Sequence, residues 1–378
     1  MIKWLFKYGA AIFLFNTILL SIVSTYRLGD IIFLGCMALF ALLLVINPKQ
    51  IRHILFHKAF TFFLIINVLN LSYFILFHGV FEIPALKYIL ARGVQFSVIS
   101  FSIYFHYDYY KSKFLDHLVY LIFAIVLISF VSNPYIFSGR YSGIIWNPNM
   151  FSSLSVIAFA ILFLQNKIKS NFDYFMLFLF LLMAIVSGSR GSLVAIFLVY
   201  LLKYGFSFRN LLYGVIAFAF AIAISVINLD TSLNRLAEQS MFGDRMLQYK
   251  YAILSIKHKL FIGYGLDKYA YINKSLVPIF LKGKVMGAHN GYLALLTQYG
   301  IIFGSLMLYI ISQQSYKLLS FFRNSLEYER VYVFIIIYTL IASLYETLIT
   351  GINEFQTILF WFALAFLSYS KFNQENAN

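Results

Sequence analysis

Apolar runs of about twenty residues recur along almost the whole chain. A run of that length can cross a bilayer as a helix, which satisfies its backbone hydrogen bonds internally. Charged residues make up only 11% of the 378 positions, against roughly 25% in soluble domains. The 43 Phe and 29 Tyr also exclude a disordered chain, because such side chains demand burial. We therefore predict an all-α, polytopic membrane protein.

The runs indicate twelve transmembrane helices in a single integral membrane domain, 1–378. We place them near 4–23, 30–46, 60–77, 85–105, 115–132, 149–165, 172–187, 191–205, 210–228, 289–312, 331–350 and 355–370. No small-residue cleavage site follows the first run, so we interpret it as a retained span. A long loop, 230–287, separates the ninth span from the tenth. The single cysteine, Cys36, excludes a disulfide within the chain.

The positions of the basic residues predict the orientation. In a soluble protein a net charge of +15 would suggest nucleic acid, but in a membrane protein it reflects the positive bias of cytoplasmic loops. The short outer loops hold only Arg27, Arg140 and Arg190. With the N-terminus inside, the cytoplasmic segments hold fifteen basic residues: Lys3, Lys7, Lys49, Arg52, Lys58, Lys111, Lys113, Lys167, Lys169, Lys203, Arg209, Lys317, Arg323, Arg330 and Lys371. Both termini are therefore predicted inside, and no nucleic-acid partner is expected.

The long loop is basic although its predicted position is outside. Nine basic residues stand there against Asp230, Glu238, Asp244 and Asp267. Because long loops translocate largely regardless of charge, this excess indicates an anionic partner at the outer membrane surface. Apolar side chains at three- and four-residue spacing also predict an amphipathic helix, with Asp244 as its N-cap and its end near Gly263. These side chains are Met246, Tyr249, Ile253, Ile256 and Leu260. The helix would lie in the headgroup plane, pack on the bundle, or do both.

Four short polar segments stand at predicted outer helix ends. They are Arg140–Gly143 with Trp146–Asn149, Ser187–Ser192, Gly243–Arg245 and Ala288–Tyr292. Arg190 carries the strongest signal, because a guanidinium at a helix N-terminus in a Gly/Ser turn favours an anion. The alternative is an arginine that reaches a lipid phosphate.

His289 is the only histidine at a predicted outer helix start. The positive helix end and the nearby arginines disfavour imidazolium, so we expect a neutral ring that can accept a proton. The alternative is an interfacial histidine without chemistry. No His and carboxylate pair has metal-ligand spacing, so no metal is predicted. Arg92 within the fourth span indicates an internal polar site of unknown use. Glu346 and Glu354 could orient an arginine or a histidine, or belong to a solvated turn.

Three segments, in order, resemble the superfamily of O-antigen polymerases and O-antigen ligases. The first is Ser187-Gly188-Ser189-Arg190-Gly191-Ser192-Leu193. The second is Arg245 with the helix leading to Phe261-Ile262-Gly263-Tyr264-Gly265. The third is His289-Asn290-Gly291-Tyr292-Leu293, followed by Gln298-Tyr299-Gly300-Ile301-Ile302. The resemblance covers about the C-terminal half; the first half is similar only in the number and character of its spans.

The resemblance implies transfer of a glycan from undecaprenyl diphosphate onto an acceptor hydroxyl at the outer face of the bacterial inner membrane. Arginines can stabilise the diphosphate leaving group without a metal, and a neutral histidine can act as the base. We therefore expect His289 to be the base and Arg190 and Arg245 to hold the diphosphate. Substrate contacts are expected from Arg140, Tyr141, Asn149, Ser189, Asn290 and Tyr292. No cofactor is expected.

The expected partners are the lipid-linked donor, a glycan acceptor, membrane lipids and a chain-length regulator. A polymerase, which extends another lipid-linked repeat unit, is favoured over a ligase, which accepts the lipid A core. A lipid-linked oligosaccharide flippase or transporter is the alternative from another class. Such proteins often show internal repeats and a central cytoplasmic loop, whereas the long loop here is late and predicted outside.

Overall fold

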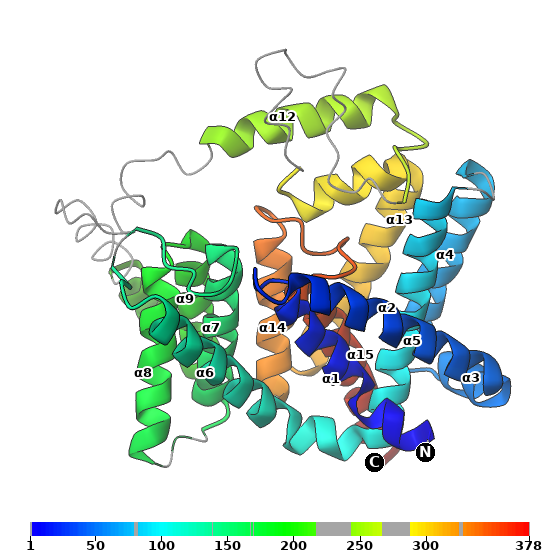
Figure 1. Ribbon diagram of the computed structural model, residues 1–378. Helices are drawn as coiled ribbons and strands as arrows, with labels where there is room; N and C mark the ends of the chain where they lie inside the picture. Colours follow the sequence, from blue (N-terminus) through cyan, green and yellow to red (C-terminus); the bar gives the residue numbers. More distant parts are fainter. Residues whose placement is uncertain are drawn as a thin grey trace.

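The computed structural model describes residues 2–78, 82–137, 139–166, 168, 170–216, 243–266, 288–324 and 328–377. These residues form a helical protein without strands, as the apolar runs predict (Figure 1). The main helices of the described residues are α1 (Ile2–Leu19), α2 (Tyr26–Ile46), α3 (Pro48–Leu55), α4 (Thr61–Phe77), α5 (Ile83–Ser112), α6 (Phe114–Ser132), α7 (Pro148–Leu164), α8 (Asn171–Val186), α9 (Arg190–Tyr204), α12 (Gly243–His258), α13 (Gly291–Phe321), α14 (Tyr328–Ala342) and α15 (Phe355–Ala377).

Five of the described helices are long and apolar enough to cross a membrane, which makes the chain a multi-pass membrane protein. They are α2, α5, α6, α13 and α15. Four shorter apolar stretches, Phe6–Leu19, Thr61–Phe77, Pro148–Leu164 and Asn171–Val186, coincide with other predicted spans. Most of the predicted ninth span, 210–228, lies outside the described residues, and so does most of the loop 230–287. The number of twelve spans and the orientation therefore stay predictions.

The predicted span 331–350 is shorter in the structure. Helix α14 ends at Ala342, and Ser343–Glu354 forms an irregular connection, here called the α14–α15 loop. The sequence predicts a span to residue 350 because the apolar residues Leu344, Leu348 and Ile349 continue the run. In the structure the loop also contains Glu346, Gly351 and Glu354. Its carbonyl groups accept hydrogen bonds from other helices.

Helix α12 crosses one end of the bundle, above the α14–α15 loop, while both chain termini lie at the opposite end (Figure 1). It begins at Gly243, so Asp244 lies within the first turn; the prediction that Asp244 is the N-cap is wrong. The apolar positions predicted for one face are not all buried. Ala252, Ser255 and Ile256 are buried, whereas Met246 and Ile253 are exposed.

Two glycines let the segment after α12 contact α13 backbone to backbone. Gly263 and Gly300 both have positive φ, of 71° and 69°, and α13 is kinked at Gly300. A Cβ on Gly300 would lie 2.3 Å from the carbonyl oxygen of Phe261. The amides of Tyr264 and Gly265 donate to the carbonyls of Thr297 and Gln298, at 2.9 and 3.0 Å. This contact fixes the end of α12 relative to the start of α13, where His289 precedes the helix.

Candidate active site

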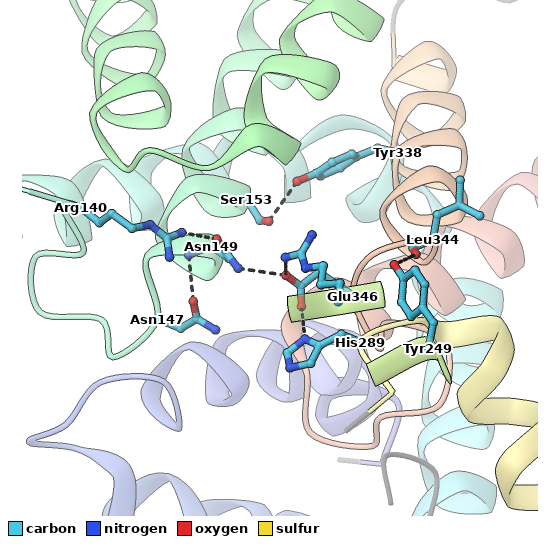
Figure 2. A network of polar contacts seen from close by, with 10 residues as sticks. Arg140, Asn147, Asn149, Ser153, Tyr249, His289, Tyr338, Leu344 and Glu346 are labelled. Atoms are coloured by element: carbon cyan, nitrogen blue, oxygen red, sulfur yellow. Dashed lines mark hydrogen bonds and ion pairs between the residues drawn. The ribbon is translucent and has the colours of Figure 1, made fainter. Parts of the chain in front are cut away.

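Glu346 in the α14–α15 loop joins two residues that the sequence places in separate segments. Its Oε1 accepts a hydrogen bond from Nη2 of Arg245 on α12, at 3.1 Å. Its Oε2 lies 3.5 Å from Nδ1 of His289, next to the start of α13 (Figure 2). The three side chains are 22 to 34% exposed, so they are accessible to a substrate. A carboxylate, a guanidinium and an imidazole therefore share one surface at the α12 end of the bundle.

The segment before α7 reaches the same carboxylate. Asn149 donates from Nδ2 to Oε1 of Glu346 at 2.9 Å and accepts a hydrogen bond from Nη2 of Arg140 (Figure 2). Asn147 caps α7 by accepting from the amide of Asn149, which holds that residue at the helix start. Arg140 is thus connected to Glu346 through a single amide side chain.

The turn between α8 and α9 borders this network. Nε of Arg140 donates to the carbonyl of Ser187 at 3.3 Å, and the amide of Tyr141 donates to the carbonyl of Val186 at 3.2 Å. Arg190 is partly exposed at the start of α9. The next residue, Gly191, faces Tyr345, since a Cβ there would lie 2.7 Å from the Tyr345 hydroxyl. The start of α9 therefore lies against the residue before Glu346.

His289 has an unusual backbone conformation for a residue with a side chain. Its φ is 42°, in the left-handed region that few residues other than glycine adopt. Asn290, the next residue, caps α13 by accepting hydrogen bonds from the amides of Tyr292 and Leu293. Its Nδ2 also donates to the carbonyl of Leu344 at 3.0 Å. Asn290 therefore attaches the start of α13 to the loop that carries Glu346.

Helix α12 is attached to the same loop. The Tyr249 hydroxyl donates to the carbonyl of Leu344 at 2.6 Å (Figure 2). The Arg245 guanidinium lies 5.5 Å from the centre of the Tyr345 ring, within the range of a cation–π contact. The amide of Gly291 adds a bond to the carbonyl of Ser343, at 2.7 Å. Glu346 is therefore surrounded by residues whose backbone is held by α12 and α13.

Four other residues expected at the substrate have structural contacts. The buried Tyr141 donates its hydroxyl to the carbonyl of Asn133, and Tyr292 donates to that of Leu340. The carbonyl of Ser189 accepts from the Ser192 hydroxyl. Asn290 acts as the cap described above. Their expected substrate contacts stay predictions, as do the catalytic roles of Arg190, Arg245 and His289.

The sequence left the role of Glu346 open, and the structure places it at the centre of the network. Its position at the edge of an apolar run gave no sign of its neighbours, because Asn149, Arg245 and His289 are 57 or more positions away. Within the described part of the chain, no group of three or more His, Cys, Asp or Glu side chains could hold a metal.

Comparison with known proteins adds one match. Residues 175–309 match the family described as O-antigen ligase. That range begins within α8 and ends within α13, so it contains Arg190, Arg245 and His289 but neither Asn149 nor Glu346. No curated protein matches the chain. The matched family contains membrane glycosyltransferases, which favours an enzyme over the transporter alternative. The chain is therefore similar, over residues 175–309, to the family of O-antigen ligases.

Proposed function

We propose that the chain is a surface-polysaccharide polymerase. It transfers a glycan from undecaprenyl diphosphate to a hydroxyl of another lipid-linked repeat unit. The contact of Glu346 with both Arg245 and His289 carries this proposal, because it combines a cation for the leaving group with a base for the acceptor. The reaction takes place at the periplasmic face of the inner membrane, where a chain-length regulator can reach the growing product.

Arg245 and Arg190 hold the diphosphate. In the reaction, the bond between the anomeric carbon and the diphosphate oxygen breaks, and the electron pair leaves with undecaprenyl diphosphate. Guanidinium groups stabilise that negative charge through paired hydrogen bonds. At α9 the helix N-terminus adds its positive end, since Arg190 is the first helical residue. Arg140 reaches this area through Asn149 and Ser187 and acts as a helper.

His289 takes the proton of the acceptor hydroxyl as its oxygen bonds to the anomeric carbon. A ring that carries its hydrogen on Nδ1, toward Glu346, leaves Nε2 free to accept this proton. The carboxylate then stabilises the imidazolium that forms, as a triad aspartate does in serine hydrolases. The proton thus goes to His289, while the arginines stabilise the charge of the leaving group. The transfer needs no further co-reactant.

The matched family favours a second candidate, since it is described as O-antigen ligase. A ligase would use the same donor site and the same base but would accept the lipid A core. The two candidates differ only in the acceptor, so the donor roles of Arg190 and Arg245 are common to both.

The surface glycan of a deletion strain tests the proposal. Lipid A core that carries a single repeat unit supports the polymerase. Bare core with accumulated lipid-linked polymer indicates the ligase, and unprocessed precursor on the cytoplasmic side indicates a flippase. Complementation with His289→Ala or Arg190→Lys should fail at normal membrane expression, because lysine cannot form the paired contact of a guanidinium. Full complementation by either variant would contradict the role of that residue.

A further inference from the structure

Arg92 is buried in the centre of the bundle. It lies on α5, is 2% exposed, and forms no salt bridge with a carboxylate among the described residues. A buried charge without a salt-bridge partner is expensive, and in membrane helices such charges mark functional positions. Its guanidinium lies within 5.7 Å of the ring centres of Tyr88, Phe96 and Trp361. These contacts alone do not explain the choice of arginine, because an apolar side chain would pack there without the desolvation penalty.

Among the described residues, the hydrogen bonds of Arg92 go to the α14–α15 loop. Its Nη2 donates to the carbonyl of Thr350 at 2.7 Å and to that of Gly351 at 3.0 Å. One nitrogen therefore holds two successive carbonyl groups, which fixes the orientation of the peptide plane between them.

Two neighbours on the same face of α5 extend this contact. Gln95 donates from Nε2 to the carbonyl of Ile352 at 2.8 Å, and Tyr88 donates its hydroxyl to that of Thr350 at 3.3 Å. We call Tyr88, Arg92 and Gln95 the α5 clamp. At positions i, i+4 and i+7 they form one stripe on the helix. All three side chains are at most 5% exposed.

The α5 clamp holds the inner part of the loop whose outer part carries Glu346. The outer part is attached to α12 and α13 through the carbonyls of Ser343 and Leu344. Glu346 lies between these two sets of attachments. Its carboxylate position, and so its contact with His289, depends on both.

We propose that Arg92 is a positioning residue, which acts through the α14–α15 loop to hold Glu346 against His289 and Arg245. The effect of Arg92 on catalysis rests on the proposed function. The attachment of the loop to Arg92 can be measured without a transfer assay. A displacement of about 1 Å at a reacting group can reduce a rate by roughly a hundredfold. Loss of Arg92 should therefore lower turnover more than it weakens donor binding.

The test compares Arg92→Met with Arg92→Lys and, as a matched control, Lys87→Met at an exposed position of the same helix. Hydrogen exchange of the 343–354 amides is measured in nanodiscs, and kcat and the donor KM are measured in a transfer assay. In Arg92→Met we expect exchange of the loop to accelerate at least tenfold. We also expect kcat to fall about tenfold or more, with KM within twofold. Arg92→Lys should show smaller changes in loop exchange and in kcat, and Lys87→Met should match the wild type.

Unchanged loop exchange in Arg92→Met would overturn the proposal, as would faster exchange with unchanged kcat. If Arg92→Met does not fold, Gln95→Met removes the bond from the α5 clamp to Ile352. That variant should show a smaller change in the same direction, and no change would again contradict the proposal. A wild-type chain that folds but transfers no glycan would refute the proposed function, while the exchange data would still decide whether Arg92 holds the loop.

Discussion

Oε2 of Glu346 lies 3.5 Å from Nδ1 of His289, although the two residues belong to different segments at the α12 end of the bundle. The same carboxylate bonds Arg245 through its other oxygen. A histidine paired in this way has a fixed orientation and a carboxylate that stabilises its protonated form.

Glu346→Gln should keep the shape of the side chain and remove its charge. The imidazolium of His289 then loses its stabilising partner, so we expect kcat to fall by at least about tenfold, since general base catalysis as a whole contributes roughly 10²–10⁴-fold. Steady-state transfer at saturating donor measures this. Glu375→Gln is the matched control, because that side chain is 55% exposed and lies near the C-terminus. A Glu346→Gln enzyme with turnover within twofold of the wild type would exclude the pairing from catalysis.

Arg245→Lys should weaken donor binding. Lysine keeps the charge, but it cannot place two parallel N–H groups on a diphosphate, nor reproduce the stacking on Tyr345. We expect the donor KM to rise about tenfold, which corresponds to roughly 1.4 kcal/mol. Lys250→Gln, at an exposed position of the same helix, should leave KM unchanged. Equal effects of both substitutions would indicate a general dependence on the charge of α12 instead of a specific contact.

Glu354 should make stability depend on pH. Burial raises the pKa of this carboxyl from 4.5 to about 7, and the nearby Glu346 adds to the shift. The Thr357 hydroxyl donates to Oε2 of Glu354 at 3.0 Å, which lowers the pKa, but the effect of burial is larger.

Ionisation of the buried Glu354 should destabilise the folded chain as the pH rises. Between pH 4.5 and about 7 the folded chain retains a proton that the unfolded chain has lost, so the free energy of unfolding decreases as the pH rises through this window. Glu354→Gln should therefore raise the melting temperature more at pH 8 than at pH 5. Thermal unfolding in nanodiscs measures the difference, with Glu375→Gln as control. The same gain at both pH values would show that Glu354 is ionised throughout.

Gly300→Ala should destabilise the junction of α12 and α13. The positive φ disfavours alanine, and its Cβ would meet the carbonyl of Phe261 at 2.3 Å. We expect a loss of about 2 kcal/mol or more. Gly35→Ala is the matched control, because no atom lies within 4 Å of a Cβ at this helical glycine; there alanine should stabilise by about 0.5–1 kcal/mol. Equal melting temperatures for wild type and Gly300→Ala would contradict the backbone contact.

The fold class could be predicted from the sequence because the bilayer imposes a length and a composition on each helix. Helix ends were harder. The apolar pattern extended the span 331–350 beyond Ala342, since Leu344, Leu348 and Ile349 continue the run. The N-cap of α12 was misplaced because Asp244 is a favourable cap by residue type, whereas the helix begins one residue earlier.

The basic residues of the site could be predicted from the sequence, whereas the central role of the Glu346 carboxylate could not. Arg190, Arg245 and His289 stood out because charges and histidines at helix ends of a membrane protein are few. Glu346 and Arg92 are also rare charged residues in an apolar chain. Their partners are far away in the sequence, and no spacing rule connects either residue to its partners.

By itself, the sequence determined that this chain is a helical membrane protein with a concentration of arginines and one histidine at predicted outer helix ends. Those properties follow from local composition and from the transfer of side chains between water and lipid. Only the tertiary structure decided that Glu346 joins Asn149, Arg245 and His289, and that Arg92 holds the loop between α14 and α15 from within the bundle. Such contacts depend on how the helices pack, because packing brings together residues that no local pattern relates.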